Sequence, residues 1–271
     1  MEDKVVIITG GTSGIGKALA FEFGRHGSNI VVTGRRIEGL DETRAALEAA
    51  GITCLALRAD VSLEEDAKKM VEEVLYKFNR IDVLINNAGI SMRALFEDVE
   101  IDVIKKVMDI NFYGAVYTTK YCIPHIVKTK GSVVGISSIA GYRGLPARVG
   151  YSTSKFALQG FLEVLRTEML YKGVHVLIAC PWFTSSHIRE TALGADGHVQ
   201  GESPRKEEKM MSAEECARRI YKGTVKRKKV LILTLQGKLL VFLNNMFPGF
   251  MDKIVYRQMS REPGAPFSVP D

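Results

Sequence analysis

The sequence predicts an α/β fold in which one doubly wound parallel sheet is flanked by helices on both faces. The first observation is that short runs rich in valine and isoleucine alternate with longer segments of helical periodicity. The second is that these runs are continuously apolar, which is typical of parallel strands buried on both faces. Crossover helices then cover the two faces of such a sheet. Because no linker or repeat interrupts the pattern, we expect a single domain over residues 1–271.

Each predicted strand is a short apolar run with β-branched residues. In chain order the strands are KVVIIT (4–9), NIVVTG (29–34), TCLALRADV (53–61), IDVLINNAG (81–89), GSVVGISS (131–138) and VHVLIACP (174–181). Each predicted helix repeats apolar residues at intervals of three and four positions. The helices cover residues 16–27, 40–51, 62–79, 101–127 and 151–172. This alternation gives each parallel strand a helical connection to the next.

Two further segments follow the last of these strands. Residues 184–211 carry glycines and charges with little periodicity, and we expect them to form a flexible flap over the substrate. Residues 230–260 form an apolar extension, whose uncharged run from Leu239 to Met251 is shorter than the roughly 20 residues that span a bilayer. Either the extension packs on the body and covers a partner subunit or the substrate mouth, or it lies on a membrane surface with basic residues facing anionic headgroups.

The composition is that of a soluble protein, with 46% hydrophobic and 25% charged residues. The formal net charge is +6, but the cations are spread along the chain apart from one cluster at residues 226–229, so we expect no nucleic-acid partner. The four cysteines and five histidines show no metal-ligand spacing, and we expect no metal site. Widely spaced thiols, and a first apolar run that begins already at Val5 without a leader, favour a cytoplasmic location.

A glycine-rich turn follows the first predicted strand and leads directly into a helix. The segment TGGTSGIG places glycines at positions 10, 14 and 16. Glycine lets the backbone turn tightly and approach a ligand closely, while the helix N-terminus offers unpaired N–H groups and a positive dipole end. The turn therefore predicts a pyrophosphate site.

Tyr151 and Lys155 stand four residues apart in the last predicted helix of the sheet. Residues at this spacing lie on one helical face, so the Lys155 ammonium can lie beside the Tyr151 ring and favour the ionised phenol. A tyrosine with its pKa brought down in this way can act as an acid and a base near neutral pH.

Together these motifs resemble the short-chain dehydrogenase/reductase family of the classical type. The matching pattern runs from about Lys4 to Thr184 and consists of Thr9-Gly10-x-x-x-Gly14-x-Gly16, Asn86-Asn87-Ala88-Gly89, Asn111, Ser138 and Tyr151-x-x-x-Lys155. The resemblance implies a Rossmann-like fold, a nicotinamide cofactor, and hydride transfer between that cofactor and an alcohol or ketone carbon. For the cofactor site it implies contacts with Gly10, Thr12, Ser13, Gly14, Ile15, Gly16, Arg35, Arg36, Asp60, Val61, Asn87, Ala88, Gly89, Tyr151, Lys155, Pro181 and Thr184.

The end of the second predicted strand bears on the type of cofactor. A carboxylate there would hydrogen-bond the ribose of NAD, whereas a cation pairs with the 2′-phosphate of NADP. This chain has Arg35 and Arg36 at that position, so we expect NADP(H) to be preferred over NAD(H). Glu38, slightly further along, keeps NAD open as an alternative.

The catalytic roles come from the resemblance together with simple chemistry. Tyr151 would donate the proton in a reduction, and both the Lys155 ammonium and the oxidised nicotinamide would favour its phenolate form. Lys155 would also bond the nicotinamide ribose. Ser138, at a strand end, would hydrogen-bond the substrate oxygen, with Ser137 as its neighbour and competitor. Asn111 would help to hold a water that relays the proton to Lys155.

One departure from the family pattern follows the last strand. Pro181 is followed by Trp182, where the family usually has glycine, and a residue other than glycine is disfavoured at positive φ. Trp182 is either a packed aromatic, which we favour, or a wall on which the substrate stacks.

We therefore expect an NADP(H)-dependent carbonyl reductase or alcohol dehydrogenase that acts on a lipophilic, steroid-like or long-chain lipid substrate as part of lipid metabolism. Similar tails occur in family members that resemble hydroxysteroid dehydrogenases and ketosphinganine reductases. One alternative is a 3-oxoacyl-thioester reductase of fatty-acid synthesis, and another is a non-catalytic nucleotide-sensing protein. We expect a homodimer or homotetramer.

Overall fold

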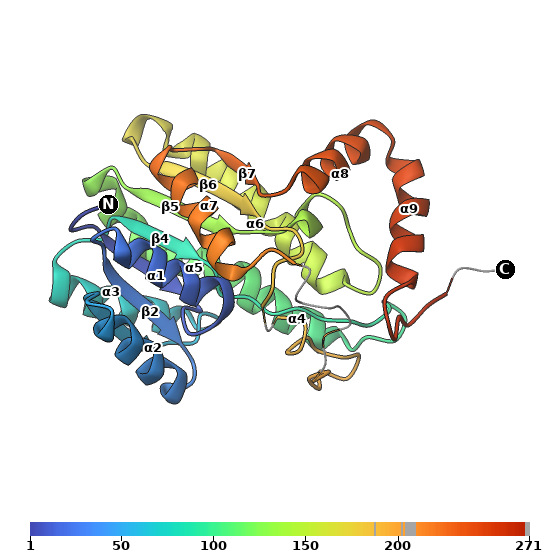
Figure 1. The fold of residues 1–271 in the computed structure, drawn as a ribbon, viewed down its shortest axis with the longest axis horizontal. Helices are drawn as coiled ribbons and strands as arrows, with labels where there is room; N and C mark the ends of the chain where they lie inside the picture. Colours follow the sequence, from blue (N-terminus) through green and yellow to red (C-terminus); the bar gives the residue numbers. More distant parts are fainter. Residues whose placement is uncertain (187, 202, 204–209, 269–271) are drawn as a thin grey trace.

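Seven parallel strands form one sheet in the order β3-β2-β1-β4-β5-β6-β7 (Figure 1). The computed structural model describes residues 1–186, 188–201, 203 and 210–268. The strands are β1 (Val5–Thr9), β2 (Asn29–Gly34), β3 (Cys54–Arg58), β4 (Val83–Asn86), β5 (Ser132–Ile136), β6 (His175–Cys180) and β7 (Val230–Ile232). The strand order reverses between β1 and β4, which opens a crevice at the carboxyl ends of these strands. This topology confirms the predicted doubly wound sheet.

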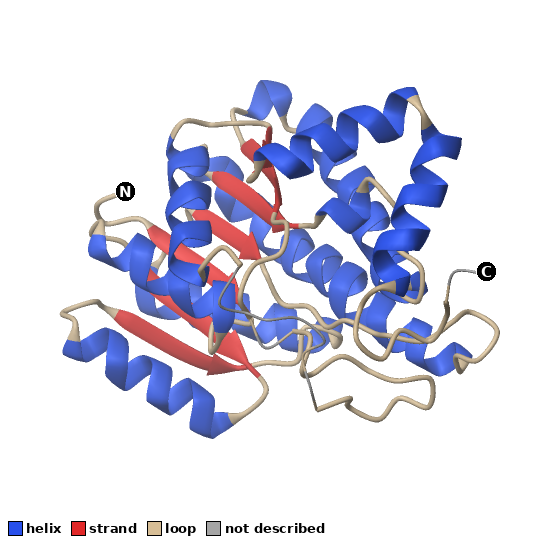
Figure 2. Cartoon of the chain, turned by 45° about the vertical axis from the view of Figure 1, so that its right-hand side comes forward, coloured by secondary structure: helices blue, strands red, loops and turns tan. Residues whose placement is uncertain are grey.

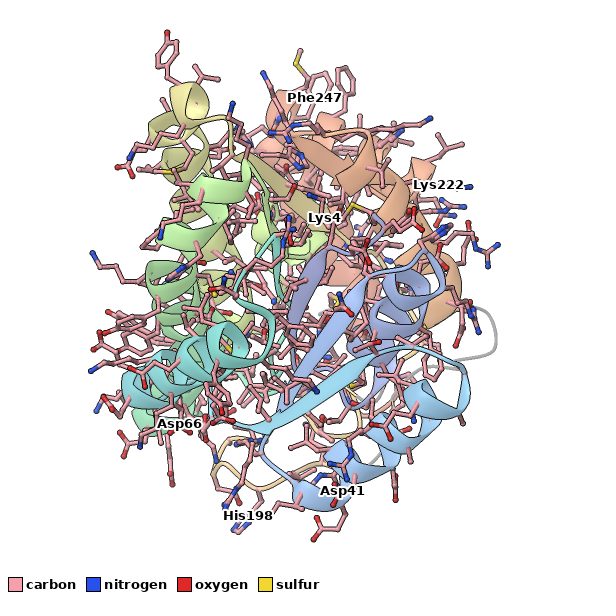
Figure 3. All side chains as sticks on the ribbon, turned by 90° about the vertical axis from the view of Figure 1, so that its left-hand side faces the viewer. Lys4, Asp41, Asp66, His198, Lys222 and Phe247 are labelled. Atoms are coloured by element: carbon pink, nitrogen blue, oxygen red, sulfur yellow. The ribbon has the colours of Figure 1, made fainter. Side chains whose placement is uncertain are left out.

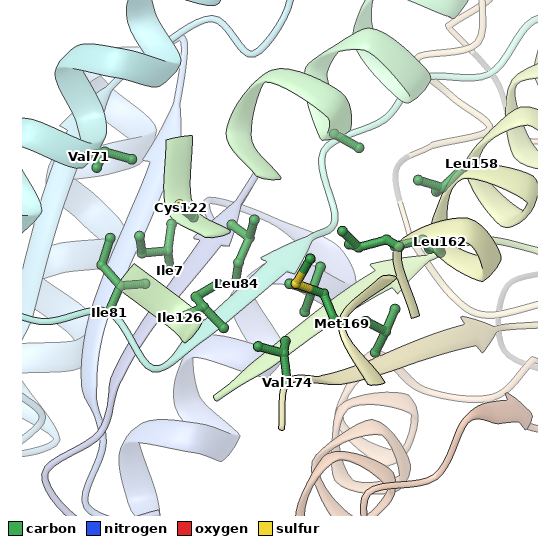
Figure 4. Close-up of a cluster of buried hydrophobic side chains, with 14 of the residues drawn as sticks. Ile7, Val71, Ile81, Leu84, Cys122, Ile126, Leu158, Leu162, Met169 and Val174 are labelled. Carbon is green, nitrogen blue, oxygen red and sulfur yellow. The ribbon is translucent and has the colours of Figure 1, made fainter. Parts of the chain in front are cut away.

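Helices cover both faces of the sheet (Figure 2). They are α1 (Gly14–Arg25), α2 (Ile37–Ala49), α3 (Glu64–Phe78), α4 (Ile101–Met108), α5 (Gly114–Thr129), α6 (Val149–Glu168), α7 (Ala213–Val225), α8 (Leu235–Met246) and α9 (Pro248–Ser260). Successive residues of a strand point to opposite faces, so β1 buries Ile7 against α3, α5 and α6 but Ile8 against α1, α2 and α7. Figure 4 shows part of the first of these cores, with Ile7 and Leu84 from the strands and Ile126 and Leu162 from the helices.

The predicted strands are longer than the observed ones at their carboxyl ends. The run predicted over residues 81–89 leaves the sheet after Asn86, and the run predicted over 131–138 leaves it after Ile136. The residues that follow, 87–89 and 137–138, have small side chains that a strand could accommodate. Their backbone nevertheless turns at the edge of the crevice instead of continuing the hydrogen-bonded ladder. Among the polar residues that follow these strands, Asn87 and Ser137 form side-chain hydrogen bonds within the protein, and Ser138 lines the crevice.

The long helix predicted over residues 101–127 is divided into three parts. Between α4 and α5 the backbone forms a π-helical segment, η1 (Asp109–Tyr113), which contains Asn111. A π-helical insertion in a helix is rare and occurs frequently at functional sites. The apolar periodicity continues through the insertion, which is why the sequence does not reveal it.

The apolar extension predicted over residues 230–260 forms the short edge strand β7 and the helices α8 and α9. Asn244 of α8 donates to the Tyr142 carbonyl at 3.1 Å, and Asp252 of α9 pairs with Arg143. Met251, Val255 and Met259 of α9 are buried together. None of the helices in the described ranges has the length and apolarity needed to cross a membrane.

The flap predicted over residues 184–211 includes positions 187, 202 and 204–209, which lie outside the described residues. Its described part is joined to the body by backbone hydrogen bonds, from Arg93 to Leu193 at 2.8 Å and from Leu193 to Ser91 at 3.0 Å. Flexibility of this segment stays a prediction.

Candidate active site

The glycine turn after β1 is joined to the turn after β4 by a set of short hydrogen bonds. The Thr9 hydroxyl accepts from the backbone N–H groups of Asn87 and Ala88, both at 3.0 Å. The Asn87 amide in turn donates to the carbonyls of Thr9 and Gly10, at 2.9 and 3.1 Å. The two sequence motifs TGGTSGIG and NNAG therefore form one rigid unit at the point where the strand order reverses.

The glycines of this unit occupy positions that other residues cannot fill. Gly10 and Gly14 have φ values of +63° and +50°, and a Cβ at Gly10 would lie 2.9 Å from Ala88 Cα. A Cβ at Gly16 would overlap the Gly10 carbonyl oxygen. Ser13, at the N-cap of α1, makes no side-chain cap hydrogen bond, so the N–H groups of the first helical turn stay available to an anion.

Polar groups at the end of β2 lie next to this cradle. The Thr33 hydroxyl is buried and lacks a hydrogen-bond partner among the described residues. Arg35 and Arg36 are exposed and line the same cavity as the glycine turn, whereas Glu38 is exposed in the first turn of α2. A backbone cradle for a diphosphate, with unsatisfied polar and cationic groups beside it, fits a dinucleotide.

Ser138 and Tyr151 face each other at the carboxyl end of β5. The Ser138 hydroxyl caps the 3₁₀ turn η2 (Ile139–Gly141) by accepting from Ala140 N–H at 3.1 Å, which leaves its own proton to donate. Ser137 is turned into the interior, where its hydroxyl accepts from the Gln159 amide at 2.9 Å. The geometry therefore favours Ser138 over Ser137 as the group that meets a substrate.

The pKa of Tyr151 differs in direction from the sequence-based expectation. Burial raises it, and the Ser138 side chain together with the guanidinium groups of Arg189 and Arg148 lowers it only in part. Among the protein groups, desolvation outweighs the nearby positive charge, and the additional lowering of the pKa expected from an oxidised nicotinamide stays a prediction. Tyr151 is thus held in its protonated form.

Lys155 lies on the same face of α6 as Tyr151. Its ammonium nitrogen is 5.7 Å from the centre of the Tyr151 ring and donates to the Ile136 carbonyl at 2.9 Å. Only 4% of the residue is exposed, and burial lowers its pKa to about 8. The predicted placement of the amine beside the phenol ring is present, with the amine buried and Tyr151 half-buried at the cavity.

Asn111 sits behind the site and does not line the cavity. Its side-chain oxygen accepts from Ile90 N–H at 2.8 Å, and its amide donates to the Ile90 carbonyl and to the Ser154 hydroxyl, both at 2.9 Å. A Cβ at the neighbouring Gly89 would lie 3.2 Å from the Asn111 side-chain oxygen and 3.5 Å from the Lys155 amine. The Asn111 side chain thus fixes the turn after β4 against α6, and a role in proton relay stays a prediction.

The remaining predicted site residues line one cavity of about 880 Å³. At the nucleotide end Asp60 accepts from the Ser62 backbone N–H at 3.0 Å and Val61 is buried. At the other end the cavity is lined by residues that sequence reasoning did not single out, among them Leu145, Arg148, Arg189, Leu193, Leu240, Val255, Met259 and Glu262. One interpretation of the apolar extension predicted a cover over the substrate mouth, but no motif identified the individual residues.

The segment after β6 adopts an ordinary backbone conformation in spite of its missing glycine. Trp182 is not among the residues with positive φ, packs against the first core, and also lines the cavity. The Thr184 hydroxyl donates to the Trp182 carbonyl at 3.0 Å, and the Thr184 carbonyl accepts from Arg189 at 2.7 Å. A Cβ at Gly14 would touch Ser186 at 3.3 Å, so this segment crosses over the glycine turn.

The chain after α9 returns to the cavity and is fastened there. Glu262, whose side chain is 6% exposed, pairs with Arg148 at 3.4 Å and with Arg93 at 4.0 Å. Arg93 also donates to the Pro263 carbonyl at 2.7 Å. We call this contact between the chain after α9 and the two arginines the latch. It closes one side of the cavity one helical turn away from Tyr151.

Comparisons with known proteins agree with this geometry. A family model described as short chain dehydrogenase matches residues 4–195. The chain is 34% identical over 268 residues to dehydrogenase/reductase SDR family member 7B of Mus musculus, covering 97% of this chain and 83% of that protein. It is 36% identical over 247 residues to 11-beta-hydroxysteroid dehydrogenase-like 4A of Arabidopsis thaliana, covering 90% and 81%.

Two solved structures share the fold. An alcohol dehydrogenase from the archaeon Thermococcus sibiricus, complexed with 5-hydroxy-NADP, matches with a TM-score of 0.75 at 23% identity, covering 86% of this chain and 96% of that one. A short chain dehydrogenase/reductase from Burkholderia phymatum, in complex with NAD, matches with a TM-score of 0.78 at 20% identity, covering 99% of both chains.

The lowered pKa of Lys155 makes a prediction about stability. Between a folded pKa of about 8 and the ordinary value of 10.5, the unfolded chain binds the proton that the folded chain has released, so this residue makes stability rise with pH. The Lys155→Met variant lacks this titration. The unfolding free energy of the wild type should therefore rise by about 3 kcal/mol relative to that of Lys155→Met as the pH rises through this range. Denaturant unfolding of both proteins over a pH series measures it, and a difference independent of pH would contradict the buried cation.

Proposed function

The chain belongs to the short-chain dehydrogenase/reductase family, and from that premise we propose that it is an NADP(H)-dependent oxidoreductase that interconverts a lipophilic secondary alcohol and its ketone. Membership of the family makes it an oxidoreductase with a nicotinamide cofactor. The observation that carries the finer proposal is the placement of Ser138, Tyr151 and Lys155 in one cavity with the glycine cradle, next to a wall of apolar side chains.

In this proposal the protein residues manage the proton and the charge on the substrate oxygen. When bound, the nicotinamide cofactor would provide the hydride chemistry, and the glycine cradle would hold its diphosphate. Tyr151 donates a proton to the carbonyl oxygen during reduction, and its raised pKa keeps that proton in place until the oxygen becomes basic. Ser138 donates a hydrogen bond to the same oxygen. Lys155 would orient the nicotinamide ribose of the cofactor. It would also return a proton to Tyr151 after the phenol has given up its own.

The preference for NADP(H) rests on Arg35 and Arg36. Two exposed guanidinium groups at the end of β2, in the cavity that holds the glycine turn, suit a 2′-phosphate, which they can contact in a bidentate manner. Two positive charges attract the additional phosphate of NADP more strongly than the hydroxyl of NAD.

A lipophilic substrate is supported by the wall opposite the nucleotide end. Leu145, Leu240, Val255 and Met259 line it, and all four lie outside the nucleotide cradle. Glu262 pairs with Arg148 there, which weakens the attraction of that guanidinium for an anionic substrate. A relative that carries the name 11-beta-hydroxysteroid dehydrogenase-like supports a steroid-like or long-chain lipid. A cytoplasmic location and a homodimeric or homotetrameric assembly stay predictions.

The Tyr151→Phe variant tests the proton donor. The phenol works mainly in the transition state, so turnover should fall about 10²- to 10⁴-fold while NADPH binding changes only a few fold. The matched control is Tyr171→Phe, because Tyr171 is 98% exposed in the 3₁₀ turn after α6. Steady-state kinetics with NADPH binding by fluorescence measure both quantities. Turnover near the wild-type rate in Tyr151→Phe would remove the proposed mechanism, and an inactive wild type would favour a nucleotide sensor.

The double variant Arg35→Asp with Arg36→Ala tests the cofactor. We expect the ratio of kcat/KM for NADPH over NADH to fall by about tenfold or more, because a carboxylate repels the 2′-phosphate. Arg44→Asp on the exposed side of α2 is the control for a charge change nearby. An unchanged ratio in the double variant would contradict the assignment of the two arginines.

A panel of ketones with NADPH oxidation as the readout tests the substrate class. We expect steroid ketones and long-chain ketones to be reduced with higher kcat/KM than small ketones, because the wall around Leu145 and Val255 is apolar. Efficient turnover of acyl-carrier-protein thioesters, without turnover of free lipids or steroids, would instead favour a 3-oxoacyl-thioester reductase.

A further inference from the structure

Helices α8 and α9 carry a row of large apolar side chains on their outer side. Six of them are between 54% and 81% exposed: Leu235, Leu239, Phe242 and Met246 on α8, Phe247 at the bend, and Phe250 on α9. The α8 positions recur at intervals of three and four, so they lie on one face of the helix. We call this row the outer face. Figure 1 shows the two helices as an angled arm beside the body, and Figure 3 places Phe247 at the rim of the molecule.

The opposite sides of the same helices are apolar as well, and they are buried. On α8, Leu240 and Val241 pack against the first core, and on α9 Met251, Val255 and Met259 form their own cluster. Amphipathic surface helices present polar residues to water, whereas a helix that is apolar on all sides is expected to be covered on all sides. The inner sides of α8 and α9 already hold these helices on the body. The apolar residues of the outer face are therefore not needed to hold them there.

The charges around the outer face have one predominant sign. Residues 235–261 contain the cations Lys238, Lys253, Arg257 and Arg261 and a single carboxylate, Asp252. That carboxylate is paired with Arg143 of the body. In α9, Arg257 follows Phe250 by seven positions and so lies on the same helical side. An apolar row flanked by cations is complementary to the interface of an anionic bilayer.

We propose that the outer face docks on an anionic phospholipid bilayer, with Phe242 and Phe250 entering the interface and the flanking cations contacting lipid headgroups. A second copy of the chain is the other candidate occupant. In a two-fold contact this surface would meet itself, so the cations of one copy would lie close to the cations of the other. The charge pattern therefore favours lipid over self-association.

Docking in this orientation places the substrate wall at the membrane surface. Val255 and Met259 on the inner side of α9 line the cavity, while Phe250 on the outer side would be in the bilayer interface. Binding to the membrane does not depend on the proposed reaction, because none of the six outer-face residues lines the cavity.

Vesicle co-sedimentation of the full chain tests the proposal. The two vesicle types are phosphatidylcholine alone and phosphatidylcholine with about one third phosphatidylserine. We expect binding to the second type, and we expect Phe242→Ser with Phe250→Ser to weaken it about tenfold or more. Tyr76→Ser with Tyr171→Ser is the matched control, because both tyrosines are over 90% exposed on α3 and after α6. Turnover of a soluble ketone without vesicles, or NADPH binding, checks that each variant is folded.

A charge-reversal pair tests the headgroup contact. Lys253→Glu with Arg257→Glu should weaken binding to the anionic vesicles about fivefold or more for each reversed charge. Lys68→Glu with Lys69→Glu on the exposed side of α3 changes the net charge equally and should leave binding close to that of the wild type. Equal losses in both pairs would mean attraction by the overall positive charge, which would overturn a specific docking face.

Two further results would also overturn the proposal. One is the absence of wild-type binding to anionic vesicles. The other is a change from dimer to monomer in the Phe242→Ser, Phe250→Ser variant by sedimentation velocity without lipid, because it would make the outer face a subunit contact.

Discussion

The close packing of two turns at the centre of the sheet is the constraint on which the site depends. Gly16 can lie against the Gly10 carbonyl oxygen only because Gly16 has no side chain, and the Asn87 amide donates a hydrogen bond to the same oxygen. If α1 were held further from β1 by even one methyl group, its N-terminal amides would move away from the crevice. The Thr9 hydroxyl then fixes the turn after β4 at the same place. The position of every group that follows β4 is set relative to this unit.

The nucleotide end and the substrate end of the cavity are built in different ways. The nucleotide end consists mainly of backbone at the ends of β1 and β4, so its shape depends on glycines and on the register of the sheet. The substrate end consists of side chains from the turn before α6, from the segment after β6, from α8 and α9, and from the chain after α9. A backbone site tolerates little variation in sequence, whereas a side-chain wall can change without disturbing the sheet. This division suits a family in which one hydride chemistry serves many substrates.

Local patterns made the sheet, the crossovers and the nucleotide cradle predictable from the sequence. Apolar runs, helical periodicity and the glycine spacing are properties of neighbouring residues, and Tyr151 and Lys155 are one helical turn apart. The role of Asn111 in the site stays a prediction, and its contacts with Ile90 and Ser154 depend on a π-helical segment that periodicity does not reveal. Likewise the pKa of Tyr151 is raised by burial, which the sequence does not show. The spacing of Tyr151 and Lys155 indicates only that a positive charge lies nearby.

The latch could not be predicted, because it joins Arg93 to residues that follow it by about 170 positions and carries no motif. The chain after α9 and the sheet are also held by different kinds of contact. Arg148 and Arg93 hold the chain after α9 through ion pairs, while the sheet is held by continuous apolar burial on both faces. Proteins open locally where few apolar contacts resist, at a free energy well below that of global unfolding. The wall contributed by α9 is held by the latch and also by the buried cluster of Met251, Val255 and Met259, so the substrate end of the cavity opens only if both contacts are released, whereas the glycine turn is fixed by the sheet itself.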